Sequence, residues 1–253
     1  MRDIKQEIIK TLTLIEEREH VRILLAVESG SRAWGVESPD SDYDVRFIYV
    51  RTMEDYLRLE SCRDVIEWQL DEVFDISGWD LRKVLIQVHK GSAGIFEWAT
   101  SPVIYKMTDM WQEIYEVCKP YFSIKAAWMH YLGLARGTWA KYLQEESVSY
   151  KKYIYALRPL LACRSIESGQ GIPPVHFEEL QRQNLPEELQ KAVSDMLAVK
   201  KEGTEATRNP HMPMLDAFIE QEIRRFETFA GRMEDDRKKD WGPLNRIFLK
   251  VFE

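Results

Sequence analysis

Two short apolar runs, residues 21–27 and 43–50, are typical of buried strands, and a polar segment joins them. An Asp-x-Asp pair, Asp42 and Asp44, opens the second run. Because alternate side chains of a strand lie on one face of a sheet, we expect both carboxylates to point the same way. Two carboxylates on one face offer the hard oxygen ligands that Mg²⁺ binds. The pattern therefore predicts strands of one sheet that carry a cation site.

The segment between the two runs contains a glycine next to a small hydroxyl residue, Gly30 and Ser31. Glycine lets backbone N–H groups approach a phosphate closely. Together with the aspartates, this turn predicts a site for a nucleoside triphosphate and its metal. The plainer alternative is an acidic hairpin turn in which Asp40 and Ser41 merely cap backbone groups. That alternative does not account for Asp44, which alternates into the apolar run.

Two other motifs with similar residues do not fit the chain. An EF-hand calcium loop requires Gly at its sixth position and Glu at its twelfth, where this chain has Val45 and Arg51. A Walker A loop requires Lys and then Ser or Thr after its second glycine, and here Val36 and Glu37 follow Gly35. Both motifs are therefore excluded.

The spacing of these motifs resembles a known superfamily. Gly-Ser, a gap of ten residues and then Asp-hydrophobic-Asp-hydrophobic is similar to the signature of the DNA polymerase beta-type nucleotidyltransferases. The longer string from Gly30 to Arg46 resembles the RlaP-type predicted nucleotidyltransferases. Three later blocks extend the match, at residues 78–83, 101–105 and 151–161. The resemblance covers most of the chain, and it implies an NTP substrate.

The resemblance also implies a third carboxylate, on a later strand in an apolar context. Asp75, between Phe74 and Ile76, is the preferred residue. Glu72 is the competitor, with Glu67 behind it. A plainer role for Asp75 is the N-cap of a following helix that the pattern begins at Ser77 and Gly78.

The apolar periodicity divides the chain into two halves. A helical pattern in the first eighteen residues precedes the strand patterns, which include residues 65–70 and 72–77. Beyond residue 111, helical patterns follow at 123–144, 149–168, 176–200 and 212–232. We therefore expect an α+β chain, with a nucleotidyltransferase-type mixed sheet flanked by helices followed by an all-helical domain. The predicted domains are residues 1–119 and 120–253.

A basic stretch in the helical half is a candidate for nucleotide contacts. If residues 151–158 are helical, Lys151, Tyr155 and Arg158 share one face. Lys151 or Lys152 is then placed for the phosphates, and Tyr155 for the base or sugar. An ordinary amphipathic helix with solvent-facing lysines would explain the same pattern. With the family resemblance, we give the nucleotide-binding face and the ordinary helix equal weight.

Charge and composition narrow the class of protein further. The net charge of −7 argues against broad nonspecific binding to nucleic acid, although one basic cleft for an RNA end remains compatible with it. The basic groups near the motif are Arg32, in the glycine turn, and Arg46 and Arg51; most such charges are expected to be solvated. The chain has no apolar segment long enough to span a membrane and no signal peptide, so we expect a cytoplasmic protein.

These observations predict a metal-dependent nucleotidyltransferase. Asp42, Asp44 and Asp75 are the predicted catalytic and metal-binding residues, with Mg²⁺ or Mn²⁺ as cofactor. Gly30, Ser31 and Arg32 are the predicted nucleotide contacts in the turn. The acceptor is a hydroxyl, with an RNA end in RNA repair favoured over a small molecule or a protein. The alternative is a catalytically silent nucleotide-binding or antitoxin-like protein.

Overall fold

The computed structural model describes residues 3–71, 73–202 and 207–253. By internal contacts, the chain divides into two compact units. One unit comprises residues 1–30, 42–122 and 238–253, and the other comprises residues 31–41 and 123–237. The division after residue 122 lies near the predicted boundary at residue 120. Chain order alone does not predict that residues 31–41 group with the helices or that residues 238–253 group with the sheet.

The first unit contains a five-stranded mixed sheet of order β3-β4-β2-β1-β5. Its strands are β1 (Arg22–Glu28), β2 (Tyr43–Val50), β3 (Val65–Leu70), β4 (Phe74–Asp80) and β5 (Ile104–Met107). β2 and β4 pair in parallel, whereas the other neighbouring strands are antiparallel. The predicted mixed sheet flanked by helices is therefore confirmed. β5 was not predicted from the sequence.

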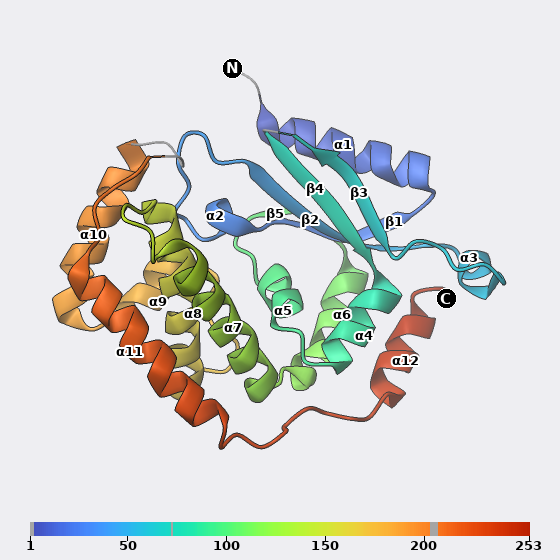
Figure 1. Cartoon of the computed structure of the whole chain (residues 1–253). Coiled ribbons are helices and arrows are strands. Elements are labelled where there is room, and N and C mark those ends of the chain that lie inside the picture. Colours follow the sequence, from blue (N-terminus) through green and yellow to red (C-terminus); the bar gives the residue numbers. More distant parts are fainter. Residues whose placement is uncertain (1–2, 72, 203–206) are drawn as a thin grey trace. The chain divides into compact units, whose positions relative to one another are not determined.

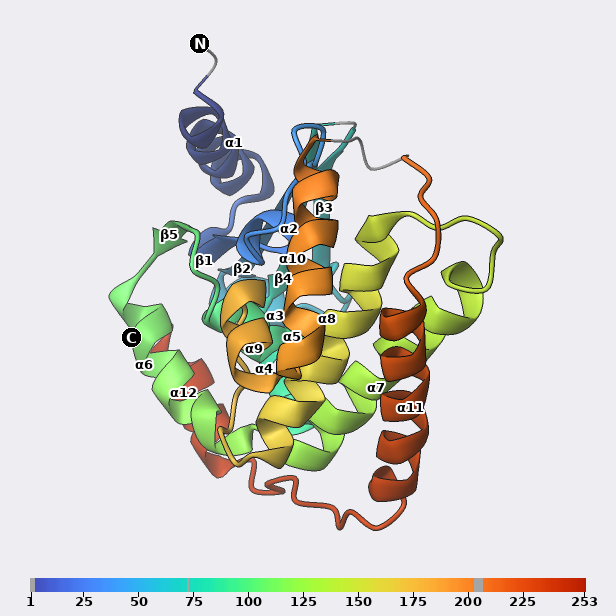
Figure 2. The same cartoon turned by 90° about the vertical axis from the view of Figure 1, so that its left-hand side faces the viewer.

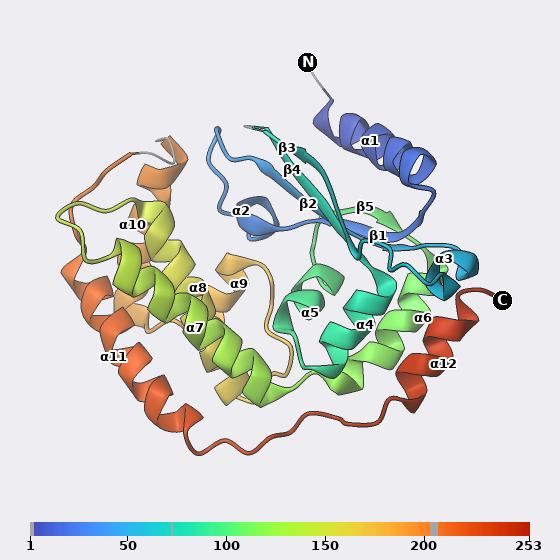
Figure 3. The same ribbon diagram turned by 45° about the vertical axis from the view of Figure 1, so that its right-hand side comes forward.

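Helices cover both faces of this sheet (Figure 1). The helices of this unit are α1 (Ile4–Glu19), α3 (Met53–Leu57), α4 (Leu81–His89), α5 (Ala93–Ala99), α6 (Asp109–Cys118) and α12 (Gly242–Lys250), with a 3₁₀ turn at Lys119–Tyr121. The buried stripe of α1 shares a core with Val45 and Phe47 of β2 and with Ile76 of β4. Figure 3 shows α4, α5 and α6 on the opposite face. Because side chains alternate, Asp44 and Arg46 lie on the face that α1 does not cover.

The predicted strand at residues 72–77 and the helix after it were misplaced. β4 runs from Phe74 to Asp80, and α4 begins at Leu81. The N-cap of α4 is Asp80, whose carboxylate accepts a hydrogen bond from the backbone N–H of Arg82 at 2.7 Å. Pairing with β2 extends the strand through Gly78, where an added Cβ would lie 2.1 Å from the Phe47 ring. The capping role considered for Asp75 is therefore excluded.

The second unit is helical, as predicted for the C-terminal half (Figure 2). Its helices are α7 (Ile124–Tyr142), α8 (Tyr150–Glu167), α9 (Phe177–Asn184), α10 (Glu187–Glu202) and α11 (Pro213–Ala230). The predicted helix at 176–200 is two helices, separated at Leu185 and Pro186, because proline disfavours the helical conformation of the residue before it. In short α2 (Gly30–Ala33), Gly30 is assigned to the first unit and the following residues to the second. No helix among the described residues is long and apolar enough to cross a membrane.

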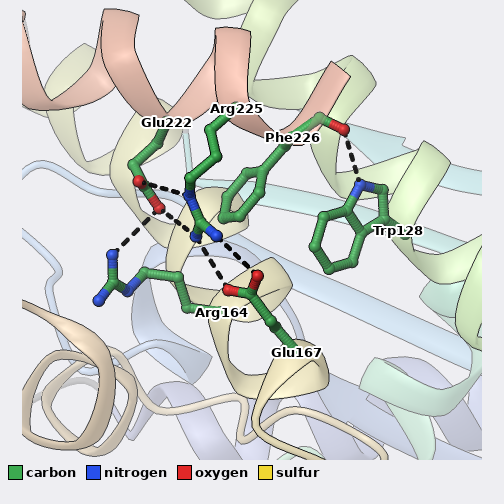
Figure 4. A network of polar contacts seen from close by, with 6 residues as sticks. All are labelled: Trp128, Arg164, Glu167, Glu222, Arg225 and Phe226. Atoms are coloured by element: carbon green, nitrogen blue, oxygen red, sulfur yellow. Dashed lines mark hydrogen bonds and ion pairs between the residues drawn. The ribbon is translucent and has the colours of Figure 1, made fainter. Parts of the chain in front are cut away.

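An ion-pair network joins α8 to α11 inside the helical unit (Figure 4). The buried carboxylate of Glu222 accepts hydrogen bonds from Arg164 at 3.1 Å and from Arg225 at 2.9 and 3.0 Å. Arg225 also forms a bidentate pair with Glu167. Hydrogen bonds to Glu222 and Glu167 raise the pKa of Arg225, because they stabilise its charged form. The network thus neutralises a buried acid and connects the two helices.

Candidate active site

The centre of the candidate site is a pair of aspartates on adjacent parallel strands. Asp44 of β2 and Asp75 of β4 are register partners. Side chains of register partners point to the same face of a sheet, so the two carboxylates are neighbours. Both side chains are partly exposed.

Arg46, two residues after Asp44 on the same face, lies between the two carboxylates. Its Nη2 donates to Asp44 Oδ1 at 3.1 Å and to Asp75 Oδ2 at 2.6 Å. Its Nη1 donates to Asp75 Oδ1 at 3.0 Å and to the carbonyl oxygens of Asp75 and Val45 at 2.8 and 3.2 Å. The guanidinium therefore offsets the repulsion between two adjacent negative charges.

The glycine turn lies directly against Asp44. Gly30 has a φ of 60°, in the left-handed region that glycine adopts without a Cβ penalty. A Cβ added to Gly30 would lie 2.0 Å from Asp44 Oδ2, so that carboxylate fills the space a side chain would need. The backbone N–H of Ser29 donates to the carbonyl oxygen of Asp44 at 2.8 Å. The turn and the acidic strand are thus one local structure.

A buried glutamate positions the backbone of Asp44. Glu28, at the end of β1, is 1% exposed, and its Oε1 accepts from the backbone N–H of Asp44 at 2.7 Å. Its Oε2 accepts a hydrogen bond from the hydroxyl of Tyr105. The carbonyl oxygen of Glu28 accepts from the Ser101 hydroxyl at 2.6 Å. A buried carboxylate is costly unless such donors satisfy it, so this arrangement fixes the end of β1 beside the site.

The other acids considered in the sequence do not belong to the Asp44–Asp75 register pair. Asp42 precedes β2, which begins at Tyr43, and it is partly buried. Glu67 of β3 is exposed and lies opposite Ser77, further along β4 from Asp75. Glu72 lies outside the described residues. Among the residues that the structure describes, no three His, Cys, Asp or Glu side chains form a group that could hold a metal ion.

The remaining residues of the turn belong to the helical unit. Ser31 is buried, and its carbonyl oxygen accepts from the backbone N–H of Val36 at 3.0 Å. Nη2 of Arg32 donates to the carbonyl oxygen of Ser41 at 2.6 Å, which closes the loop between its two ends. Arg32 therefore has a role in loop structure that its position in the sequence does not indicate.

The predicted basic face of α8 gathers around Trp34, on the same loop. Tyr155 packs edge-on against Trp34, with ring centroids 5.1 Å apart, and the Arg158 guanidinium lies 4.5 Å from the Trp34 ring. The ammonium groups of Lys151 and Lys152 lie 5.6 and 5.5 Å from the Tyr155 ring. One aromatic contact and three cation–π contacts thus connect these five side chains. Arg158 is 3% exposed and donates to the carbonyl oxygen of Val175, so it is a structural contact in this arrangement.

Sequence reasoning missed three residues of these local structures. Glu28 and Trp34 flank the glycine turn, but neither belongs to the Gly-Ser or Asp-x-Asp pattern that defines the candidate site. Arg46 was counted among the basic residues near the motif, most of which were expected to be solvated surface charges. Its position, two residues after Asp44 on a strand, was the available signal, because alternation places it on the acidic face.

Replacing Gly30 by alanine is expected to weaken NTP binding at least about tenfold. The new Cβ meets Asp44 Oδ2 and requires a left-handed backbone that costs an alanine roughly 1–2 kcal/mol. Calorimetric titration with an NTP and Mg²⁺ measures the effect. Gly94→Ala is the matched control, because a Cβ there would meet no atom within 4 Å apart from its own helix backbone and chain neighbours. An unchanged affinity in a folded Gly30→Ala protein would mean that the turn is only structural.

The chain belongs to the RlaP family, described as the RNA repair pathway DNA polymerase beta family, whose model matches residues 4–250. Family membership over nearly the whole chain supports a nucleotidyltransferase.

A relative and a solved structure are also similar to this chain. The uncharacterized protein YcgL of Bacillus subtilis (strain 168) is 40% identical over 252 residues, which cover 99% of this chain and 97% of that protein. A crystal structure of a nucleotidyltransferase-like protein from Exiguobacterium sibiricum 255-15 aligns with 98% of this chain and 79% of its own, at 13% identity and a TM-score of 0.31.

Proposed function

We propose that this protein is a metal-dependent nucleotidyltransferase that transfers a nucleoside monophosphate from an NTP to a hydroxyl acceptor. The observation that carries the proposal is the register pair of Asp44 and Asp75 beside the left-handed turn at Gly30. Two carboxylates on one face are the kind of ligand a divalent cation binds, and a glycine turn is the kind of backbone that phosphates bind; this pairing of features supports the proposal. Family membership supports the reaction class.

The donor set fits a divalent cation. Asp44 and Asp75 present carboxylate oxygens that already contact one cationic group, Nη2 of Arg46. In the proposed enzyme, Asp42 and Asp44 hold Mg²⁺ or Mn²⁺ together with the triphosphate. When bound, the cation neutralises charge that develops on the phosphoryl oxygens. Asp75 either contributes to a second cation or accepts the proton of the acceptor hydroxyl.

The proposed reaction is an in-line substitution at the α-phosphorus. The acceptor oxygen forms a bond to the α-phosphorus as it loses its proton. The bond between the α-phosphorus and the oxygen bridging to the β-phosphorus breaks, and pyrophosphate leaves with that electron pair. The turn at Gly30 and Ser31 binds and orients the leaving phosphates through backbone N–H groups and the Ser31 hydroxyl.

We propose that Lys151, Lys152 and Tyr155 of α8, together with Arg32, are further nucleotide contacts. Lys151 and Lys152 are partly exposed and carry the positive charge that phosphates require, whereas Tyr155 offers a ring to a base or sugar. A bound base is expected to compete for the contacts that these cations make with the Tyr155 ring.

An RNA end is the acceptor we favour, because the family is described as part of an RNA repair pathway. The net charge of −7 restricts such binding to a local basic surface. A small-molecule alcohol and a protein hydroxyl are the competing acceptors.

The second candidate function is that of a nucleotide-binding protein without turnover. One observation favours it: Arg46 already pairs with both strand carboxylates.

A labelling experiment tests the reaction class and the acceptor together. The protein is incubated with Mg²⁺ and each NTP, labelled at either the α- or the γ-phosphate, against RNA, small-molecule and protein pools. We expect the α-label on an acceptor and the γ-label in released pyrophosphate. Transfer of the γ-label to the acceptor would identify a phosphotransferase instead. Metal-dependent NTP binding without release of pyrophosphate from any pool would favour the silent protein.

A further inference from the structure

Arg46 holds an unusual position for a residue of a metal-dependent site. One atom, Nη2, lies within hydrogen-bond distance of an oxygen from each carboxylate, Asp44 Oδ1 and Asp75 Oδ2. Exposed fractions are 18% for the side chain of Arg46, 20% for Asp44 and 32% for Asp75. Such partial burial reduces screening by water and strengthens the ion pairs. The guanidinium therefore stands where a cation bridging these two oxygens would bind.

A guanidinium and a divalent cation cannot share these oxygens at the same time. Mg²⁺ binds oxygen ligands at 2.0–2.1 Å and requires near-octahedral coordination, so Nη2 has to move away. The other nitrogen has two acceptors that do not compete with a metal. Nη1 donates to the carbonyl oxygens of Asp75 and Val45 as well as to Asp75 Oδ1, and only the last of these three is a carboxylate oxygen. The side chain can thus release Nη2 while Nη1 stays anchored to the backbone.

We propose that Arg46 is an internal counter-cation of the Asp44–Asp75 pair, which a divalent cation must displace before the two carboxylates can share it. This inference rests on the proposed function, since it concerns metal loading of the same site. Free Mg²⁺ or Mn²⁺ then binds weakly, because it must offset the loss of the three charge-assisted hydrogen bonds from Arg46 to the two carboxylates. Arg46 also pairs with Asp75, so the cation that displaces it exchanges one counter-charge on that carboxylate for another.

The proposal separates Arg46 from two other roles. An arginine that only stabilises the fold would lower stability on removal without changing metal affinity. An arginine that only binds the triphosphate would change NTP affinity and leave binding of the free cation unaltered. Of these three roles, only that of a counter-cation at the carboxylate pair predicts that removing the guanidinium strengthens binding of a cation without nucleotide.

Titration of Mn²⁺ without nucleotide, by calorimetry and by the electron paramagnetic resonance signal of unbound Mn²⁺, tests the inference. Arg46→Met keeps a long apolar side chain but removes the charge, and it is expected to bind Mn²⁺ at least about tenfold more tightly than the wild type. Arg46→Lys keeps a charge without the planar fork and is expected to lie between them. Mn²⁺ should also raise the melting temperature of Arg46→Met more than that of the wild type.

Controls place the effect at the proposed site. Arg51→Met removes another partly buried arginine of the same unit, whose carboxylate partner is Glu19, and should leave Mn²⁺ affinity unchanged. Adding Asp75→Asn to Arg46→Met should cancel the gain. Equal Mn²⁺ affinity in the wild type and Arg46→Met overturns the inference, as does a gain that persists without the Asp75 carboxylate. If Arg46→Met does not fold, the Mn²⁺ affinity of Arg46→Lys is compared with that of the wild type instead, and equal affinity overturns the inference.

Different experimental results would refute this inference and the proposed function. A wild type that transfers nucleotide, together with unchanged Mn²⁺ affinity in Arg46→Met, refutes only the role of Arg46. If Arg46→Met gains Mn²⁺ affinity but the wild type releases no pyrophosphate, the displacement of Arg46 is supported and the proposed transfer reaction is refuted.

Discussion

Replacing Asp42 and Asp44 together by asparagine is expected to abolish the gain in NTP affinity that Mg²⁺ provides. The two carboxylates and the triphosphate are all negative, so they repel one another until a cation lies between them. Transfer activity should fall by roughly 1000-fold or more, because each lost group that stabilises the transition state typically costs about 10²–10³ in rate. Titration with and without Mg²⁺, followed by a transfer assay, measures both effects.

A matched control removes the same number of charges elsewhere in the sheet-containing unit. Asp64 and Asp109 are exposed, and their joint replacement by asparagine should change neither NTP affinity nor transfer. Asparagine at position 44 can still accept a hydrogen bond from Arg46, so fold stability is a separate measurement. Metal-dependent NTP binding that survives in Asp42→Asn/Asp44→Asn would show that the site has been misplaced.

Local patterns predicted the architecture well because they report directly on burial. Alternating apolar residues predicted the strands at 43–50 and 65–70, and helical periodicity predicted the helices of the C-terminal half. β5 was missed because it has four residues and is largely exposed, so its apolar alternation is weak. The end of β4 was misplaced because Ser77 and Gly78 suggest a turn, whereas pairing with β2 keeps them in the strand. That pairing is a tertiary interaction, which local propensity does not report.

The candidate site was less predictable because its neighbours come from distant parts of the sequence. Asp75 was chosen for its apolar context, and only the parallel pairing of β2 and β4 shows that it lies opposite Asp44. Glu28 supports Asp44 through backbone N–H and hydroxyl donors, which leave no pattern in a sequence. The loop that follows Gly30 groups with the helices through contacts such as the hydrogen bond from the Phe177 backbone N–H to the Trp34 carbonyl oxygen. Such contacts depend on the fold.

Replacing Asp75 by alanine is expected to reduce transfer about 100- to 1000-fold while NTP affinity changes by less than about threefold. A positioned general base typically contributes about 10²–10⁴ in rate, whereas Asp42 and Asp44 suffice to seat the cation that accompanies the triphosphate. The loss should therefore appear in kcat rather than in the KM for NTP.

The pairing of Asp75 with Arg46 sharpens the design of this test. Asp75→Asn retains an acceptor for the guanidinium, so it separates loss of the carboxylate charge from loss of the Arg46 contact. Glu67→Gln and Glu72→Gln are the controls, since these were the competing acids in the sequence. A loss of transfer in either control, with activity retained in Asp75→Asn, would show that the third acid is not Asp75. Full activity in all three variants would mean that activating the acceptor requires no third carboxylate among these residues, because Asp42 and Asp44 would then suffice for catalysis.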